Sequence, residues 1–356
     1  MGRAMLILAA GATIIFGMVQ LGLLGQKKQL SLNTSEYASE YHAKNVAYTT
    51  VQLAMERLNE DDSWEPTEGS PWTTTTEGAS TSLYYETIST GASFSDPDTI
   101  RVYSTASYLD QESTIISTFS KQRLHYVPDF EAALSIATSN FTFNMSGSSG
   151  INGNEASGAC ADKPGVTVPN LSDYNEVLLG AGSKISDITS SDSKISIDPS
   201  ITYSPVDELI ARLDALPGSQ TISGNYKGSL GTVNDPGVFF VENYAKLTGG
   251  ISTGYGIMVI RSGGELEYQG ALSVAGNFEF NGLIIFENAF DFTGRGTPDL
   301  NGSILVGNTP GNTDIIDIDL GGNLQLQYDC TAEEYAQKAS SALLKQNRYT
   351  RLNTFE

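Results

Sequence analysis

The sequence predicts an α+β protein with a long N-terminal α-helical stalk, an antiparallel β-sheet packed on that stalk, and a C-terminal domain built like a β-solenoid or, alternatively, a β-sandwich. Three observations in the 356-residue chain support this fold class: an uncharged apolar run near the N-terminus, three β-branched and aromatic segments after it, and apolar segments that repeatedly follow glycine. They divide the chain into residues 1–60, 61–127 and 128–356.

The apolar run covers residues 4–25 and contains no charged residue and no proline. As an α-helix it is about 33 Å long, enough to cross the roughly 30 Å hydrocarbon core of a bilayer. No proline or glycine interrupts residues 29–59, so one helix is expected to run from about residue 4 to residue 58. Residues 1–28 form the hydrophobic, membrane-spanning part of that helix.

The second half of the expected helix is amphipathic. Val46, Val51, Ala54 and Leu58 recur at three- to five-residue spacing and place apolar side chains on one face. These four residues are predicted to pack against the sheet. The acidic residues after Asn59 and the proline at position 66 predict that the helix ends near Asp61.

Three segments after the stalk are rich in β-branched and aromatic residues: 82–88, 99–105 and 113–119. Turn-forming residues separate them, and each alternates polar with apolar side chains. This pattern predicts an antiparallel meander with one face covered by the stalk.

A glycine followed by a mainly apolar tetrad recurs roughly every 20 residues in the C-terminal part, at 237–241, 256–260, 282–286 and 302–306. A repeat of this kind indicates a β-solenoid, in which the apolar side chains point inward; a β-sandwich is the alternative. The segment near 204–217 interrupts the pattern with a predicted helix at 205–216 that is capped by Ser204.

Near residues 331–346 the sequence predicts a C-terminal helix. Thr331 and Glu334 have the spacing of a capping box, in which the threonine hydroxyl and the glutamate carboxylate satisfy the first backbone N–H groups. A final strand is expected after this helix.

Composition favours an extracellular protein. The chain has 20 lysine and arginine residues against 41 aspartate and glutamate residues, a formal net charge of −21, which argues against a nucleic-acid partner. The chain contains two cysteines, Cys160 and Cys330. In an oxidising compartment they are candidates for a disulfide, and two buried free thiols are the alternative.

The sequence contains no pattern that predicts a catalytic, cofactor or metal site. Neither His42 nor His125 belongs to a recognisable ligand motif, and the glycine-rich stretches do not match phosphate- or dinucleotide-binding loops. A non-enzymatic protein is therefore expected, and a polysaccharide-cleaving β-solenoid is the alternative.

The N-terminal run and the helix that continues it resemble type IV pilins. The segment IRVYSTASYLDQESTIISTFSKQ at 100–122 is similar to the hairpin after the stalk in PilX-type minor pilins, and the strand, helix and strand at 326–356 resemble their C-terminal end. The resemblance implies a homopolymeric extracellular filament, a location in the inner membrane before assembly, and contact there with pilus assembly machinery. It implies a filament core made by these residues: Met5, Leu6, Ile7, Leu8, Ile14, Ile15, Phe16, Met18, Val19, Leu21, Leu23 and Leu24.

One departure from the family pattern concerns the fifth residue. Most type IV pilins carry glutamate there, whereas this chain has Met5, or Ile7 if cleavage follows Gly2, and no acidic residue precedes Glu36. The difference would be explained if neighbouring subunits are aligned by packing alone. It would also be explained if the chain is a specialised tip subunit.

Three other interpretations of the same features remain open. The apolar run is alternatively a cleaved signal peptide or a plain membrane anchor for an external domain. The chain is alternatively a pilus-tip adhesin whose head binds a surface or a glycan, with Tyr244, Tyr255 and Tyr268 as candidate contacts.

Overall fold

The computed structural model describes residues 2–60, 64–91, 94, 96–125, 127, 129–215, 217–242, 246–247, 253–261, 271–275, 278–288, 290–295, 298–344 and 347–355. The chain forms two compact units. Unit 1 contains Met1–Gly91, Pro97–Gln122 and Asn347–Glu356, and unit 2 contains Ala92–Asp96 and Arg123–Gln346. The expected stalk and antiparallel sheet thus belong to one unit. The C-terminal strand, which was expected in the 128–356 head, belongs to unit 1 instead.

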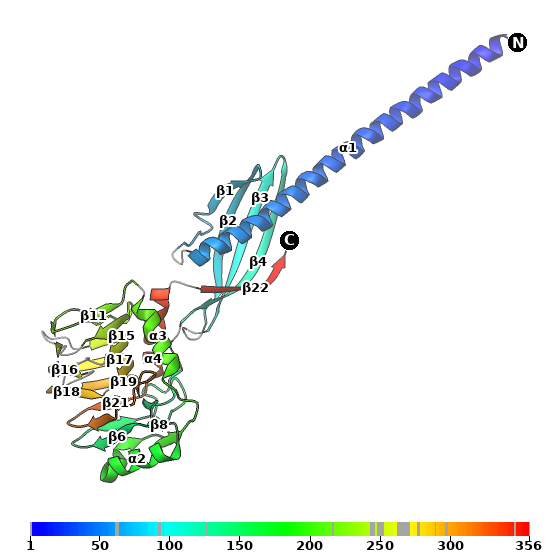
Figure 1. The fold of residues 1–356 in the computed structure, drawn as a ribbon. Coiled ribbons are helices and arrows are strands. Elements are labelled where there is room, and N and C mark those ends of the chain that lie inside the picture. Colours follow the sequence, from blue (N-terminus) through cyan, green and yellow to red (C-terminus); the bar gives the residue numbers. More distant parts are fainter. Residues whose placement is uncertain are drawn as a thin grey trace. The chain divides into compact units, whose positions relative to one another are not determined.

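Unit 1 is built on a single helix, α1 (Gly2–Glu60), which ends one residue before the expected Asp61. Its C-terminal half lies along a five-stranded sheet of order β1-β2-β3-β4-β22 (Figure 1). The strands are β1 (Trp72–Thr76), β2 (Ala79–Ser89), β3 (Asp98–Tyr108), β4 (Gln111–Arg123) and β22 (Asn347–Phe355). The pairs β2–β3 and β3–β4 are antiparallel, as the sequence predicts, and β1–β2 is antiparallel as well.

Strand β1 has no counterpart among the segments that the sequence predicts. It pairs with β2 through a two-residue turn in which Glu77 has φ 49° and Gly78 has φ 83°. Two consecutive positive φ angles match the right-handed twist of the flanking strands, which is why such turns favour hairpins. The run of threonines at 73–76 is compatible with this strand because threonine is β-branched.

The core of unit 1 lies between the helix and the sheet. Along α1, one stripe of side chains is buried: Ser39, Ala43, Val46, Ala47, Thr50, Val51, Ala54 and Leu58. The stripe contacts chiefly β3, where every second residue from Asp98 to Ala106 is buried. Two buried hydroxyls are satisfied by helix carbonyls: Ser104 Oγ donates to Ala47 O at 3.0 Å, and Thr50 Oγ1 donates to Val46 O at 2.8 Å.

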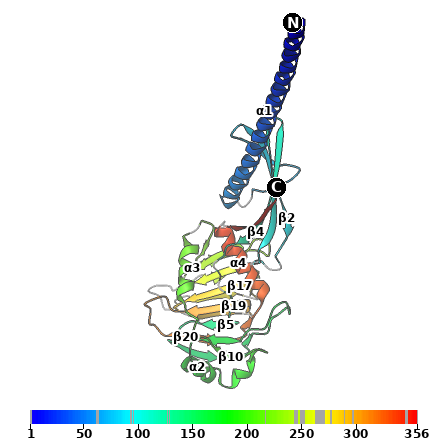
Figure 2. The same ribbon diagram turned by 90° about the vertical axis from the view of Figure 1, so that its right-hand side faces the viewer.

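Unit 2 consists mainly of parallel strands. Its largest sheet runs β10-β8-β5-β19-β17-β15-β13-β11, with β21, β7 and β9 extending from β19, and Figure 2 shows β17, β19, β5 and β10 stacked one above another. Its strands are β5 (Leu134–Ile136), β7 (Gly150–Asn152), β8 (Val166–Val168), β9 (Ile188–Thr189), β10 (Ile195–Ile197), β11 (Gln220–Ile222), β13 (Gly237–Val241), β15 (Thr253–Ile260), β17 (Phe278–Glu287), β19 (Pro298–Gly307) and β21 (Gln325–Gln327).

Two smaller parallel sheets complete unit 2. One has the order β12-β14-β16-β18 and the other pairs β20 with β6. Their strands are β6 (Phe141–Met145), β12 (Asn225–Tyr226), β14 (Lys246–Leu247), β16 (Ala271–Ala275), β18 (Asp291–Arg295) and β20 (Ile316–Leu320). From β11 to β19 the chain alternates strand by strand between the large sheet and the four-stranded sheet, and every pair in both is parallel.

Four glycines stand in register across the large sheet: Gly237, Gly256, Gly282 and Gly302, which we call the glycine column. The last three have φ angles of 122°, 152° and 123°. A Cβ atom at Gly256, Gly282 or Gly302 would overlap the carbonyl oxygen of the preceding glycine in the column. The repeated glycine of the sequence is therefore required by close backbone approach between successive strands.

The helices of unit 2 differ in part from the sequence prediction. Helix α2 (Leu171–Ala181) and the 3₁₀ helix η1 (Gly182–Asp187) were not predicted. The sequence signal for α2 was its N-cap residue, Asn170. The Asn170 side chain accepts a hydrogen bond from the Asp173 N–H at 3.1 Å. Helix α3 (Ser204–Asp214) begins within one residue of the prediction, and its N-cap is Tyr203 rather than Ser204.

Helix α4 (Cys330–Leu344) also begins one residue early. Asp329 caps it in place of Thr331, since the Asp329 carboxylate accepts from the Thr331 N–H at 2.8 Å. A carboxylate is a stronger acceptor than a hydroxyl, so the aspartate takes this role. The first residue of α4 is joined to Cys160 in a disulfide, with a sequence separation of 170 residues. Closing a loop of this size restricts the unfolded chain and contributes up to roughly 5 kcal/mol.

Replacing Val51 by aspartate is expected to unfold unit 1. Val51 is buried in the α1 stripe, and an unpaired carboxylate there costs several kcal/mol against a typical stability of about 5–15 kcal/mol. Gln52→Asp is the matched control because Gln52 is exposed on the next helix position. Circular dichroism melting of the two variants tests this, and equal melting temperatures would contradict the packing.

Replacing Gly282 by alanine is expected to destabilise unit 2 by about 2–5 kcal/mol, because the methyl group meets backbone that cannot move aside and the φ angle disfavours an L-residue. Gly321→Ala is the control, since its Cβ would make only ordinary contacts, the nearest to Ser146 Oγ at 3.5 Å. Denaturant melts read by far-ultraviolet circular dichroism measure both, and an unperturbed Gly282→Ala would exclude the close stacking of the glycine column.

Candidate functional site

The most unusual surface of the chain is the N-terminal half of α1. Its large apolar side chains are 55–79% exposed. They include all twelve residues predicted for a filament core: Met5, Leu6, Ile7, Leu8, Ile14, Ile15, Phe16, Met18, Val19, Leu21, Leu23 and Leu24. The helix is long and apolar enough to cross a membrane, and none of its most apolar stretch is buried inside the chain.

These apolar side chains lie on all sides of the helix. Consecutive residues such as Leu6, Ile7 and Leu8 point 100° apart, so no polar stripe separates them. A helix that is apolar all round is stable only when lipid or protein surrounds it. At about 25 cal/mol per Å², covering twelve such side chains releases tens of kcal/mol before the entropy of association is subtracted.

The hydroxyls of Thr13 and Thr34 are satisfied by the helix itself. Thr13 Oγ1 donates to the carbonyl oxygens of Ala9 at 2.8 Å and Ala10 at 3.0 Å, and Thr34 Oγ1 donates to Leu30 O at 2.7 Å. A threonine that bonds its own helix leaves no donor unpaired in an apolar environment. This arrangement suits burial of the whole segment.

The character of α1 changes near Ser39. Before it, the described side chains are exposed apart from a partly buried position at Gly11; after it, the stripe described above is buried. The four residues predicted for packing, Val46, Val51, Ala54 and Leu58, are each at most 3% exposed. One continuous helix therefore offers two different surfaces, one used within unit 1 and one left for another partner.

Of the three tyrosines suggested for a head ligand, the structure describes Tyr255. Tyr255 packs against Tyr335 of α4 with ring centroids 5.1 Å apart, so it is part of the helix–sheet contact. Tyr244 and Tyr268 lie outside the described residues. Among the residues that the structure describes, no group of three or more histidine, cysteine or acidic side chains is placed to hold a metal ion.

One cavity of about 230 Å³ lies in unit 2. Its lining includes Asp129 and Glu131 together with apolar residues such as Leu283 and Leu305. Beside these acids stands Glu333, in the first turn of α4. Burial, and next the negative charge of Asp129, raises the pKa of Glu333 to about 7. The described lining of this cavity contains no histidine, cysteine or lysine.

The comparisons with known proteins identify no family for this chain. No protein-family model matches the chain, and no curated protein matches it. Among solved structures, the competence-associated pilin ComZ from Thermus thermophilus is similar over 90% of this chain and 97% of that chain, with 9% identity and a TM-score of 0.26. A TM-score this low carries no argument about fold or function.

Unit 2 is expected to lose stability as the pH rises from about 4.5 to 7 through the titration of Glu333. Because the pKa of this carboxyl is higher in the folded chain, the folded state binds more protons than the unfolded state in this window. Glu333→Gln should flatten the dependence and raise the melting temperature at pH 8. Glu334→Gln, one residue along α4, is the control, and identical pH profiles for the two variants would refute the assignment.

Proposed function

We propose that the chain is a structural subunit of an extracellular, type IV pilus-like filament. The N-terminal half of α1 anchors it in the inner membrane before assembly and then forms the filament core by packing against other copies. The observation that carries the proposal is the change along α1 from an apolar surface exposed all round to a single buried stripe. The partners are other copies of the chain and the assembly machinery of the inner membrane, and the role is non-enzymatic.

We further infer that unit 2 is a β-solenoid rather than a β-sandwich. Support comes from the strand-by-strand alternation between two parallel sheets and from the glycine column. Within the pilin-like proteins, the hairpin at 100–122 favours a PilX-type subunit, because β3 and β4 form the antiparallel pair that the motif implies.

The absence of a glutamate at position five bears on how such a filament would be registered. The charged residues of α1 before Ser39 are Arg3, Lys27, Lys28 and Glu36. No carboxylate is available near the N-terminus to pair with a neighbouring subunit's amino group. Registration would then depend on shape, and the four glycines at 11, 17, 22 and 25, whose positions are open on the helix surface, offer close-approach points for a neighbour.

The Ile14→Asp variant is expected to abolish filaments while units 1 and 2 stay folded. Ile14 is 60% exposed on the free chain, so the charge does not disturb packing within the chain, but between subunits it would be buried without a partner. Ile14→Leu is the control that keeps the site apolar. Electron microscopy of surface fibres, with circular dichroism as the folding check, distinguishes the outcomes.

Filaments of normal number and length from Ile14→Asp would refute the assembly role of α1. Wild-type protein that stays in the membrane and forms no fibres would identify a plain anchor instead. Presence once per fibre rather than along its whole length, as seen by antibody labelling, would identify a tip-located adhesin.

A further inference from the structure

A row of polar side chains crosses the strands at one edge of unit 2. Gln327 of β21 is in register with Asn152 of β7, which is in register with Thr189 of β9. The residues next to them in the strands, Ile151 and Leu326, are buried. Since side chains alternate between the two faces of a strand, the polar row lies on the outer face of the sheet. We call Thr189, Asn152 and Gln327 the amide row.

Hydrogen bonds between neighbouring side chains hold the amide row in place. Thr189 Oγ1 donates to Asn152 Oδ1 at 3.0 Å, and Asn152 Nδ2 donates to Gln327 Oε1 at 2.8 Å. Gln327 Nε2 also donates to the Tyr328 carbonyl at 3.0 Å. The side chains are therefore ordered before any ligand binds, which lowers the entropy that binding would cost.

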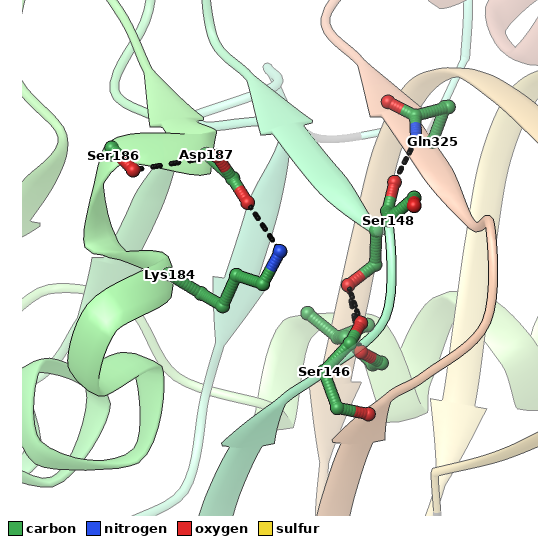
Figure 3. A network of polar contacts seen from close by, with 8 residues as sticks. Ser146, Ser148, Lys184, Ser186, Asp187 and Gln325 are labelled. Carbon is green, nitrogen blue, oxygen red and sulfur yellow. Dashed lines mark hydrogen bonds and ion pairs between the residues drawn. The ribbon is translucent and has the colours of Figure 1, made fainter.

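The amide row forms part of an open groove of about 540 Å³. Helix α4 packs over β15, β17 and β19, and the strands beyond them, β21, β7 and β9, line the groove. The 3₁₀ helix η1 contributes Lys184, Ser186 and Asp187, and the turn before β7 contributes Ser148. Figure 3 shows Lys184 and Asp187 on one side and Ser148 and Gln325 on the other.

Gly150 lies in the floor of the groove. A Cβ atom there would meet the Gln325 side-chain oxygen at 2.7 Å and the Asp187 carbonyl at 3.7 Å. Glycine at this position thus leaves room for the Gln325 side chain to lie against the strand backbone. The volume lies within the range of about 300–1,000 Å³ that ligand sites occupy.

The charge of the groove is balanced. Its one lysine, Lys184, forms an ion pair with Asp187 at 3.1 Å, and the remaining lining consists of amides, hydroxyls and small apolar groups. Amide and hydroxyl oxygens each carry two lone pairs, so those that accept one hydrogen bond within the groove can accept another, which an apolar ligand cannot supply. A polyanion would be repelled by the net charge of −21. An uncharged ligand rich in hydroxyls satisfies both constraints.

We propose that the groove formed by the amide row, Gly150, Gln325 and η1 binds a neutral polysaccharide. Successive strands lie about 4.8 Å apart, so the row repeats at a distance comparable to the length of one sugar ring. A glycan chain lying across β21, β7 and β9 meets one hydrogen-bonding side chain per sugar. This binding role goes beyond the filament role and does not depend on it.

The test uses the full-length chain in a sugar-free detergent and titration calorimetry with defined hexasaccharides. The neutral probes are cellohexaose, chitohexaose, maltohexaose and mannohexaose, and the anionic probe is hexagalacturonate. The groove variants are Gly150→Leu, which fills the floor, and Gln325→Ala, which removes an exposed side chain and leaves the core intact. Lys227→Ala, at an exposed position outside the groove, is the control.

At least one neutral hexasaccharide is expected to bind the wild type, with an affinity that does not change with salt. Gln325→Ala and Gly150→Leu should each weaken it about tenfold or more, as expected for the loss of one or two hydrogen bonds, while Lys227→Ala binds as the wild type does. Failure of all four neutral probes, equal binding by wild type and Gln325→Ala, or binding of hexagalacturonate alone would each overturn the proposal. Filament formation by the groove variants is expected to be normal, so this result and that of Ile14→Asp are read independently.

Discussion

The structure of unit 1 depends on the contact between one stripe of α1 and the inner face of its sheet. That contact is made by small side chains, including alanines at 43, 47 and 54, which let the helix backbone lie close to β3. The Ser104 hydroxyl reaches the Ala47 carbonyl only because the approach is so close. Beyond Ser39 toward the N-terminus the described sheet residues give α1 no such surface. The apolar side chains there can be removed from water only by lipid or by other protein chains.

Unit 2 is organised by backbone stacking instead. In a parallel sheet built from successive strands, each residue lies beside its register partner in the next strand. Where strands β13, β15, β17 and β19 approach closely, the register partners are all glycine. The glycine column is one such set of register partners, and the amide row is another with a different residue type. Asparagine and glutamine in register bond each other along the row, which turns a structural repeat into an ordered polar surface.

Local signals predicted a large part of this fold. The continuity of α1 follows from the lack of proline and glycine after residue 29, and strands β2, β3 and β4 follow from β-branched residues in alternation. The four long strands of unit 2 coincide with the repeated glycine and apolar residues. Helix α2 was missed although Tyr174, Val177 and Ala181 pack on the core at helical spacing. Its asparagine cap was a further feature that could have identified it.

By itself, the sequence determined helix α1, strands β2 to β4 and the glycine-led strands of unit 2, and which surface is too apolar for water, because those properties depend on neighbouring residues. Only the tertiary structure decided that β22 joins the sheet of unit 1 and that Asp329 caps α4. It also decided that Thr189, Asn152 and Gln327 form one row. These residues are up to 175 positions apart in the chain. Their meeting depends on the register of strands that loops of many lengths connect, and no local pattern encodes that register.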